Sequence, residues 1–325
     1  MIDSGGTRPP ETRPVKVELS AVIVTLETQA GQARPMVLTP QGPRGRDLPT
    51  AAFDPERHRT LHQALAEWVE ERTGLRLDYV EQLYTFGDPR RSAARDAAEP
   101  HTVSIGYLAL ARPEAARAAS DWTAWAHWFP WEDRRDGPPA ILAEIVLPRL
   151  AEWAARPGQS GERREQLDLL FGTGDAPWRD ELTLERYELL YSAGLVHEAW
   201  RDQGENPPPD LPALGATARR DHRRILATAI GRLRGKLKYR PVLFELIGET
   251  FTLFELQRAA EAVSGMALHK QNFRRMVERS GLIEPTGAFS SRSGGRPAAE
   301  YRLGAEAIWE RRAAAVRFGG ARRGG

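Results

Sequence analysis

The 325-residue sequence contains no cysteine. This absence excludes disulfide bonds, thiol nucleophiles, cysteine-ligated zinc fingers and iron–sulfur clusters. There is also no run of about 18 apolar residues, the length that a membrane-spanning helix needs. The first residues, MIDSGGTRPPETRPVKVEL, are polar and proline-rich, without the apolar core of a signal peptide. We therefore expect a cytoplasmic protein with no membrane partner.

Several catalytic motifs are missing as well. The sequence has no GxGxxG, GxxxxGK[ST] or GxSxG string, which are typical of dinucleotide-binding loops, phosphate-binding loops and nucleophile elbows. His58 and His62 are four residues apart, as two zinc ligands on one helix would be. Arg59, however, occupies the position where a metalloprotease has its glutamate. We therefore expect no catalytic metal and no catalytic cofactor.

Lysine is scarce, and its placement reveals a charge asymmetry. Three of the four lysines lie in residues 231–325, which hold 18 Lys or Arg against 9 Asp or Glu, a balance of +9. Residues 1–230 carry the opposite balance, −7. An acidic front and a basic back indicate that the C-terminal part meets a polyanion such as nucleic acid. A solubilising, arginine-rich surface is the alternative.

The front half reads as a mixed α/β domain, because strand patterns alternate with one helical pattern. We expect strands at Val15–Leu26, Pro35–Leu38, Leu75–Phe86 and Val103–Ala111, and a helix at Pro55–Thr73 that ends at Gly74. Residues 121–212 are predicted to be mainly helical, with one helix at Glu181–Glu198. Four tryptophans recur here at every third position, which is more typical of a core or an interface than of a ligand-stacking wall. They are Trp122, Trp125, Trp128 and Trp131.

Residues 221–237 predict an amphipathic helix that joins the two halves. One face carries apolar residues, and four arginines are expected on the polar remainder. These arginines are Arg223, Arg224, Arg232 and Arg234.

The C-terminal region predicts a winged helix-turn-helix. Thr252 and Glu255 have the spacing of a capping box, and the helix that they begin should end near Gly265. A second helix is predicted at Leu268–Ser280, after a short turn. Leu282–Thr286 and Glu300–Leu303 then predict a hairpin, the wing.

The second of these helices has the composition of a groove-reading helix. Phe273, Met276 and Val277 share one side and are expected to pack on the first helix. Gln and Asn can hydrogen-bond adenine and Arg can bind guanine, whereas arginines in a wing suit phosphate or the minor groove. The predicted DNA-binding residues are Lys270, Gln271, Asn272, Arg274, Arg275, Arg292 and Arg296. A winged helix used for protein contacts is the alternative.

These motifs carry a resemblance to a known family. The order strand–LPxxxF–helix–TGL, followed by EQLYTFGDPRR, resembles a Nudix domain. GKLKYRPVLFELIGETFTLFELQ, LHKQNFRRMVERSGLIEPTG and GGRPAAEYRL resemble the winged-helix half of NrtR-type, Nudix-related transcriptional regulators of NAD metabolism. HWFPWEDRRDGPPAIL resembles the NadQ-like branch of that group. The resemblance covers most of residues 15–318 and is strongest over 221–303.

The resemblance implies an α/β Nudix-like domain (a mixed sheet with helices) with a helical insertion, followed by a C-terminal winged helix-turn-helix domain. We expect the Nudix-like sensing domain at 15–220, with its insertion at about 121–212. The linker helix would span 221–235, and the DNA-binding domain 236–318.

The implied function is a ligand-responsive repressor of NAD biosynthesis or salvage genes. Its effector would be an adenine nucleotide: ADP-ribose, NAD or ATP. Its partner would be a double-stranded DNA operator, bound by a homodimer and therefore at the bacterial nucleoid. One alternative is an active Nudix pyrophosphatase with an accessory nucleic-acid-binding domain, and another is a nucleotide-sensing adaptor whose winged helix contacts protein.

The Nudix signature itself is degenerate in this chain. In that signature, glutamates collect the magnesium that activates water on a pyrophosphate. Aligned on Gly74, Glu71 matches one signature glutamate, but Trp68 and Arg72 occupy two others. Because an arginine repels the cation that it should help to hold, we expect no hydrolysis.

A ligand pocket can survive the loss of the metal site. The segment that matches QLYTFGDPRR offers an aromatic ring for a base and two arginines for a pyrophosphate. The predicted ligand-binding residues are Gln82, Thr85, Phe86, Asp88, Arg90 and Arg91. The alternative is a packed strand end with solvated arginines.

Overall fold

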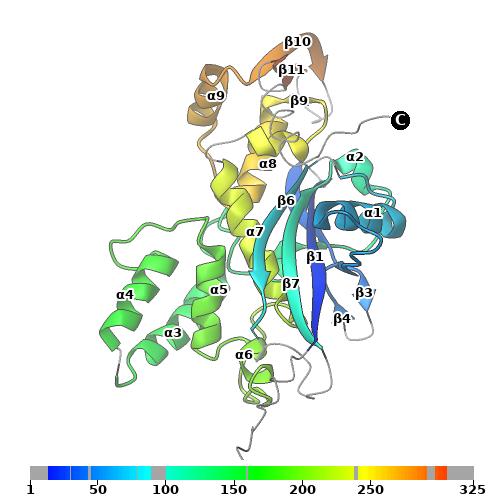
Figure 1. Cartoon of the computed structure of the whole chain (residues 1–325). Helices are drawn as coiled ribbons and strands as arrows, with labels where there is room; N and C mark the ends of the chain where they lie inside the picture. The colour runs from blue at the N-terminus through cyan, green and yellow to red at the C-terminus, as the bar shows by residue number, and fades with distance from the viewer. Residues whose placement is uncertain are drawn as a thin grey trace, which may run out of the picture.

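The computed structural model describes residues 14–29, 31–42, 45–77, 79–88, 100–158, 160–237, 241–290 and 297–305. An α/β body occupies the centre of the molecule, a group of helices lies to one side of it, and a small helix-and-hairpin domain lies at one end (Figure 1). Arg90, Arg91, Arg292 and Arg296 from the sequence predictions lie outside the described residues.

The body is built on a six-stranded mixed sheet. Its order is β6-β7-β1-β2-β8, and β5 pairs with the N-terminal half of β1, at residues 18–20. β1 and β7 are parallel, whereas the other neighbours are antiparallel. The strands are β1 (Val15–Gln29), β2 (Gln32–Leu38), β5 (Thr50–Ala52), β6 (Tyr79–Phe86), β7 (His101–Leu110) and β8 (Trp122–Ala124). Two short strands, β3 (Gln41–Gly42) and β4 (Gly45–Arg46), form a separate hairpin.

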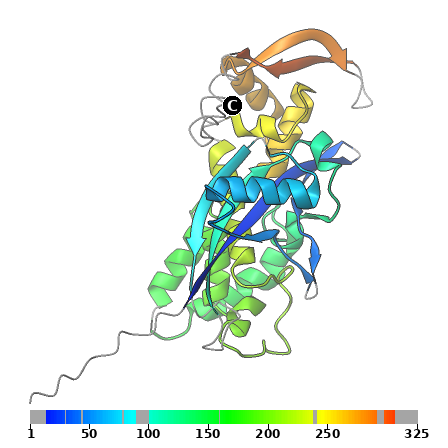
Figure 2. The ribbon, with the colours of Figure 1, turned by 45° about the vertical axis from the view of Figure 1, so that its right-hand side comes forward.

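Both faces of the sheet are covered. Alternate residues of β1 point to opposite faces, so the strand contributes to a core on each side. Leu19 and Ile23 pack with Leu65 of α1 (Leu61–Thr73), which lies across one face (Figure 2). Val22 and Val24 belong to the core on the other face, which α7 (His222–Leu237) covers.

Helix α1 is shorter than the sequence predicted. Thr60 caps its N-terminus by accepting a hydrogen bond from the Gln63 amide, and Gly74 closes it with a φ of 70°. Residues 55–57 form a turn instead of helix, and His58 lies before the helix starts, so His58 and His62 do not share a helical face.

The region after β7 contains α2 (Pro113–Ala116), α3 (Leu147–Ala154), α4 (Ser160–Phe171), α5 (Thr183–Ser192) and α6 (His197–Arg201). Short turns of other helix types occur at η2 (Trp125–His127) and η3 (Leu142–Val146). The prediction of a mainly helical region fails at its start, because β8 extends the sheet by pairing with β2. The single helix predicted at Glu181–Glu198 is also wrong, because Gly194 separates α5 from α6 with a φ of 71°.

The tryptophan run belongs to the core, as the sequence predicted. Trp125, Trp128 and Trp131 are buried in the main hydrophobic cluster, together with residues of α7 and α8. Trp122 is half-buried and donates its indole N–H to the Ala116 carbonyl oxygen at 3.0 Å.

The C-terminal domain follows α7 through η4 (Pro241–Glu245). Its helices are α8 (Leu253–Ser264) and α9 (Lys270–Arg279), and its three-stranded sheet has the order β10-β11-β9. The strands are β9 (Thr250–Thr252), β10 (Ile283–Ser290) and β11 (Ala298–Leu303). The capping box is confirmed, since Thr252 and Glu255 exchange both of its hydrogen bonds. Among the described residues, no helix is long and apolar enough to span a membrane.

Candidate functional site

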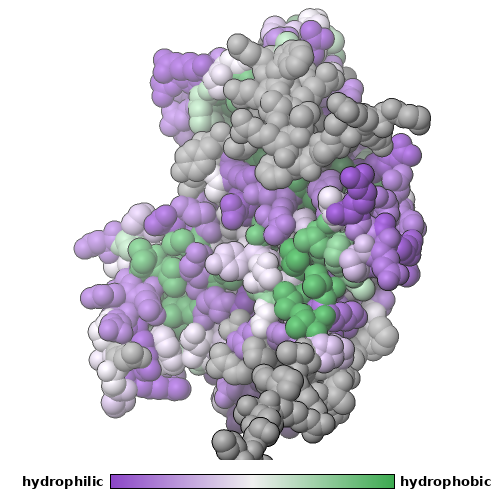
Figure 3. All heavy atoms as spheres, in the orientation of Figure 1, coloured by the Kyte–Doolittle hydropathy of each residue, from purple (hydrophilic) through white to green (hydrophobic). Residues whose placement is uncertain are grey.

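Helix α9 presents a polar face to solvent. Phe273 and Val277 are buried toward the domain, and the hydrophilic residues of α9 gather at the molecular surface (Figure 3). All five residues that the sequence predicted on this helix are exposed: Lys270, Gln271, Asn272, Arg274 and Arg275. The Arg275 guanidinium donates a hydrogen bond to the Asn272 side-chain oxygen at 3.2 Å, which orients two of them together.

Two features of this face differ from the prediction or were missed. Met276 was expected in the core but is 60% exposed, because it lies at the edge of the buried helix face that Phe273 and Val277 form. Arg279 is exposed one helical turn after Arg275, so it extends the same positive face. Its i,i+4 spacing from Arg275 was the available signal in the sequence.

The turn before α9 is fixed by a buried carboxylate. Glu261 of α8 accepts hydrogen bonds from the Leu268 amide and the Gln257 side chain, both at 3.0 Å, and Arg258 pairs with it at 3.0 Å. Because these contacts hold both sides of the turn, α9 starts from a rigid position on α8.

The end of α8 is also attached to the body of the molecule. The Arg134 amide donates to the Gly265 carbonyl oxygen at 2.7 Å, and the Arg234 side chain of α7 donates to the Val263 carbonyl oxygen at 3.0 Å. Gly265 has a φ of 70° and lies against the Glu132 carbonyl oxygen, where no β-carbon would fit. The helix-turn-helix is therefore docked on the segment that follows β8.

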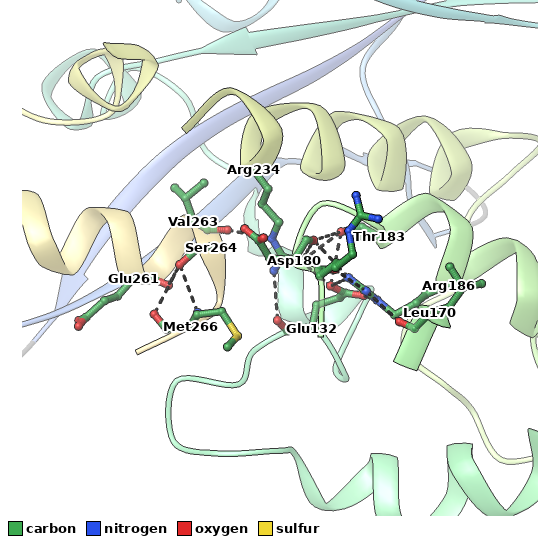
Figure 4. A network of polar contacts seen from close by, with 11 residues as sticks. Glu132, Leu170, Asp180, Thr183, Arg186, Arg234, Glu261, Val263, Ser264 and Met266 are labelled. Atoms are coloured by element: carbon green, nitrogen blue, oxygen red, sulfur yellow. Dashed lines mark hydrogen bonds and ion pairs between the residues drawn. The ribbon is translucent and has the colours of Figure 1, made fainter. Parts of the chain in front are cut away.

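A buried charge cluster lies under this docking point (Figure 4). Glu132 accepts hydrogen bonds from Arg186 of α5 at 2.6 and 2.8 Å, and it forms a second ion pair with Arg234 of α7. All three side chains are at most 1% exposed. Burial would raise the pKa of the Glu132 carboxyl, but Arg186 and Arg234 lower it overall.

The expectation that the polar side of α7 faces solvent is wrong for three of its four arginines. Arg234 belongs to the cluster, and Arg223 is equally buried, with its guanidinium donating to the Trp128 carbonyl oxygen at 2.6 Å. Arg224 is also buried, whereas Arg232 is exposed. The helix is covered on nearly all sides, so its polar face pairs with carboxylates and carbonyls instead of water.

A cavity of about 300 Å³ lies beside the end of β6, between α5 and α7. Three predicted ligand residues, Thr85, Phe86 and Asp88, line it. Gln82 does not; its side chain accepts a hydrogen bond from the Tyr107 hydroxyl at 3.4 Å. The two helices and the residue before α7 add a set that sequence reasoning missed: Leu184, Glu188, Asp221, Arg224 and Thr228.

Arg224 is the central charged group at this cavity. It donates to Glu188 at 3.0 Å and to Asp221 at 3.2 Å, and its side chain is 3% exposed. Burial works to lower the pKa of Arg224, but the hydrogen bond to Glu188 raises it above the ordinary value. The guanidinium is therefore charged and ion-paired.

The Nudix-signature positions of α1 lie on the opposite face of the sheet. Trp68 is half-buried and packs on the core of that face, while Glu71 and Arg72 are exposed. Glu70 pairs with Arg76 at 2.7 Å. Among the described residues, no group of three or more metal-ligating side chains comes together.

Comparison with known proteins agrees with this architecture. Residues 243–303 match the family model of the NrtR DNA-binding winged helix domain. The ADPR responsive transcriptional repressor NtrR of Acinetobacter baylyi is 40% identical over 83 residues, which are 26% of this chain and 33% of that protein. The chain thus matches about a third of the length of this curated relative.

Two solved structures share the fold over most of the chain. NrtR of Shewanella oneidensis, complexed with a 27mer DNA, has a TM-score of 0.52 and 22% identity, covering 90% of this chain and 95% of that one. A MutT/nudix family protein of Enterococcus faecalis has a TM-score of 0.50 and 16% identity, covering 90% and 89%. The predicted fold, a Nudix-like domain followed by a winged helix domain, is confirmed.

Proposed function

We propose that this chain is a transcriptional repressor whose winged helix binds an operator and whose Nudix-like domain senses ADP-ribose. The match of residues 243–303 to a DNA-binding domain, with an exposed basic helix in that domain, carries this proposal. The name of the Acinetobacter relative, an ADPR responsive transcriptional repressor, favours ADP-ribose over NAD and ATP as the effector.

In this proposal α9 enters the major groove. Gln271, Arg274 and Arg275 contact base edges, whereas Lys270, Asn272 and the wing arginines Arg292 and Arg296 hold phosphate or the minor groove. A homodimer places two such helices on a palindromic operator about one DNA turn apart. The genes controlled are those of NAD biosynthesis or salvage, and the protein acts at the bacterial nucleoid in the cytoplasm.

The Nudix-like domain binds its ligand without hydrolysing it. At the signature positions of α1, Trp68 turns toward the core and Arg72 adds a positive charge beside Glu71. A magnesium ion therefore lacks the ring of carboxylates that hydrolysis requires. Of the ligand residues proposed from the sequence, we keep five, and they serve for binding only: Thr85, Phe86, Asp88, Arg90 and Arg91. Gln82 is left out because it does not line the cavity.

Helix α7 couples the two sites. Asp221, Arg224 and Thr228 line the cavity near its start, and Arg234 near its end holds the last turn of α8. A ligand that binds one arrangement of α7 more tightly shifts the position of the recognition helices, by no more than its differential affinity.

A mobility-shift titration tests the proposal. The DNA is the region upstream of this chain's own gene and the promoters of NAD-synthesis genes, and ADP-ribose, NAD and ATP are titrated separately. We expect specific binding whose affinity ADP-ribose changes about 5- to 150-fold. Absence of specific DNA binding contradicts the proposed repressor. The same operator affinity with and without ADP-ribose contradicts the proposed sensor.

A further inference from the structure

The cavity at the end of β6 combines an aromatic wall with acidic groups. The rings of Tyr84 and Phe86 lie 6.2 Å apart, centroid to centroid, and Leu184 of α5 extends the apolar lining. Three carboxylates, from Asp88, Glu188 and Asp221, share the lining with one cation, Arg224. The formal charge of these described lining residues is therefore −2.

This set of side chains does not suit a pyrophosphate. Phosphate sites present unpaired guanidinium or ammonium groups, or backbone N–H groups, to the anion. Here the Arg224 guanidinium already donates to Glu188 and Asp221, so it is not available to a phosphate.

Carboxylates select hydroxyl donors instead. An ionised carboxylate offers about four acceptor positions, so pairing with an arginine leaves capacity for a ligand hydroxyl. Acidic side chains bind the ribose of dinucleotides in this way. A volume of about 300 Å³ is at the small end of ligand sites, and it suits one part of a large ligand such as ADP-ribose.

We propose that this cavity holds a ribose of ADP-ribose. Its vicinal hydroxyls donate hydrogen bonds to the carboxylates of Asp88 and Glu188, and the sugar or the base packs against the ring of Phe86. The pyrophosphate lies outside the cavity. This inference rests on the proposed function and assigns the part of the ligand that contacts α7. Thr228 forms the α7 side of the site, and its hydroxyl bonds only within its own helix among the contacts observed, to the Arg224 carbonyl oxygen at 2.8 Å.

The test is calorimetry of ADP-ribose binding to the full chain. Asp88→Asn removes the charged acceptor and should weaken binding about tenfold. Thr228→Phe fills the cavity and should weaken binding by at least as much, without loss of a tertiary hydrogen bond. Asp175→Asn, at an exposed aspartate of the helical region, is the matched control and should bind like the wild type. Thermal unfolding followed by circular dichroism verifies that each variant is folded.

Competition experiments identify the ribose. Adenosine and ribose 5-phosphate are tested as competitors of ADP-ribose, because each carries one of its two riboses. At least one of the two should compete with ADP-ribose. If adenosine competes, 2′,3′-dideoxyadenosine, which lacks the vicinal hydroxyls, should compete at least about tenfold less well.

The two proposals fail in different ways. If the wild type binds ADP-ribose but Asp88→Asn and Thr228→Phe bind equally well, the cavity is not the ribose site. Failure of both competitors, or equal competition by 2′,3′-dideoxyadenosine and adenosine, overturns the inference too. If the wild type does not bind ADP-ribose at all, the proposed sensor function itself is wrong.

Discussion

The side chains of α9 divide into those that hold the helix and those that are available to DNA. Phe273 and Val277 are buried, so replacing them would disturb the domain, whereas Arg274 and Arg275 contribute to no core. A loss of function on changing these arginines can therefore be attributed to the surface. This separation makes single-residue tests of the DNA-binding face interpretable.

Arg274→Ala and Arg275→Ala are each expected to weaken operator binding by about 1–3 kcal/mol and to relax sequence preference at one base pair. The reason is the loss of a hydrogen-bonding contact to a guanine edge. Fluorescence anisotropy on the operator and on single-base variants measures both effects. Arg76→Ala removes the same charge from an exposed position beyond α1 and should change neither. Unchanged operator affinity in both α9 variants would mean that another surface reads the DNA.

Single residues of α1 also decide whether the Nudix-like domain retains catalysis. With magnesium present, the purified protein should hydrolyse neither ADP-ribose nor NADH above background, because Trp68 and Arg72 occupy glutamate positions of the signature. Product formation by chromatography is the measurement. Metal-dependent turnover that disappears in Glu71→Gln would show that the single remaining glutamate suffices.

Among the elements, α5, α7 and the segment after β8 meet at Glu132. Removing a buried carboxylate from between two arginines leaves uncompensated positive charge, so Glu132→Gln should destabilise the protein by about 3–5 kcal/mol at neutral pH. Urea unfolding measures this loss. Glu165→Gln changes an exposed glutamate of α4 and serves as the control, with little expected effect.

The cluster also predicts how stability depends on pH. Because the pKa of Glu132 is lower in the folded protein than in the unfolded chain, its contribution is complete above the unfolded pKa, about 4.3. It is lost as pH falls further, through the folded pKa. The difference in unfolding free energy between wild type and Glu132→Gln should therefore shrink below about pH 4. A constant difference across that range would show that Glu132 is not the titrating group.

The elements also show which parts of the fold were legible in the sequence. Local signals succeeded: the Thr252–Glu255 box and the closing glycines at 74 and 265 depend on neighbours within a few residues. The burial of three of the four α7 arginines was not predictable in this way. Arg234 pairs with Glu132, 102 residues earlier, and no local pattern distinguishes such an arginine from a solvated one.

The two candidate sites, the α9 face and the cavity, also differ in how far they could be predicted from local sequence patterns. The reading face of α9 follows from one helical periodicity, so its exposed residues were found together, apart from Met276 and Arg279. The cavity combines β6 (Tyr79–Phe86) with α5 (Thr183–Ser192) and α7 (His222–Leu237), which lie much farther along the chain. The sequence therefore indicated only the strand side of it, at Thr85, Phe86 and Asp88.

For the molecule as a whole, the question is how ligand binding in the body reaches the recognition helix. The structure offers a short route: α7 begins at the cavity and its Arg234 ends at the Val263 carbonyl oxygen, while Arg134 holds Gly265. If this contact carries the signal, loosening it should separate ligand binding from DNA binding without abolishing either.

Gly265→Ala tests the route, and Gly281→Ala is its matched control. Both glycines follow a helix of the helix-turn-helix with positive φ, 70° and 66°, so alanine costs about 1–2 kcal/mol of backbone strain at either site. Only at position 265 would the new β-carbon meet other groups, the Glu132 carbonyl oxygen and, at 2.8 Å, the Arg234 guanidinium. That collision must push the end of α8 away from the body.

We expect Gly265→Ala to bind ADP-ribose normally by calorimetry but to lose most of the ligand-dependent change in operator affinity, about 1–3 kcal/mol of coupling. Gly281→Ala should retain that change, whatever its effect on operator affinity itself, because nothing lies within 4 Å of its new β-carbon. The ratio of operator affinities with and without ADP-ribose is the quantity to compare. Equal ratios in the two variants would show that the signal does not pass through the end of α8, and would direct attention to the packing of α8 on β2 instead.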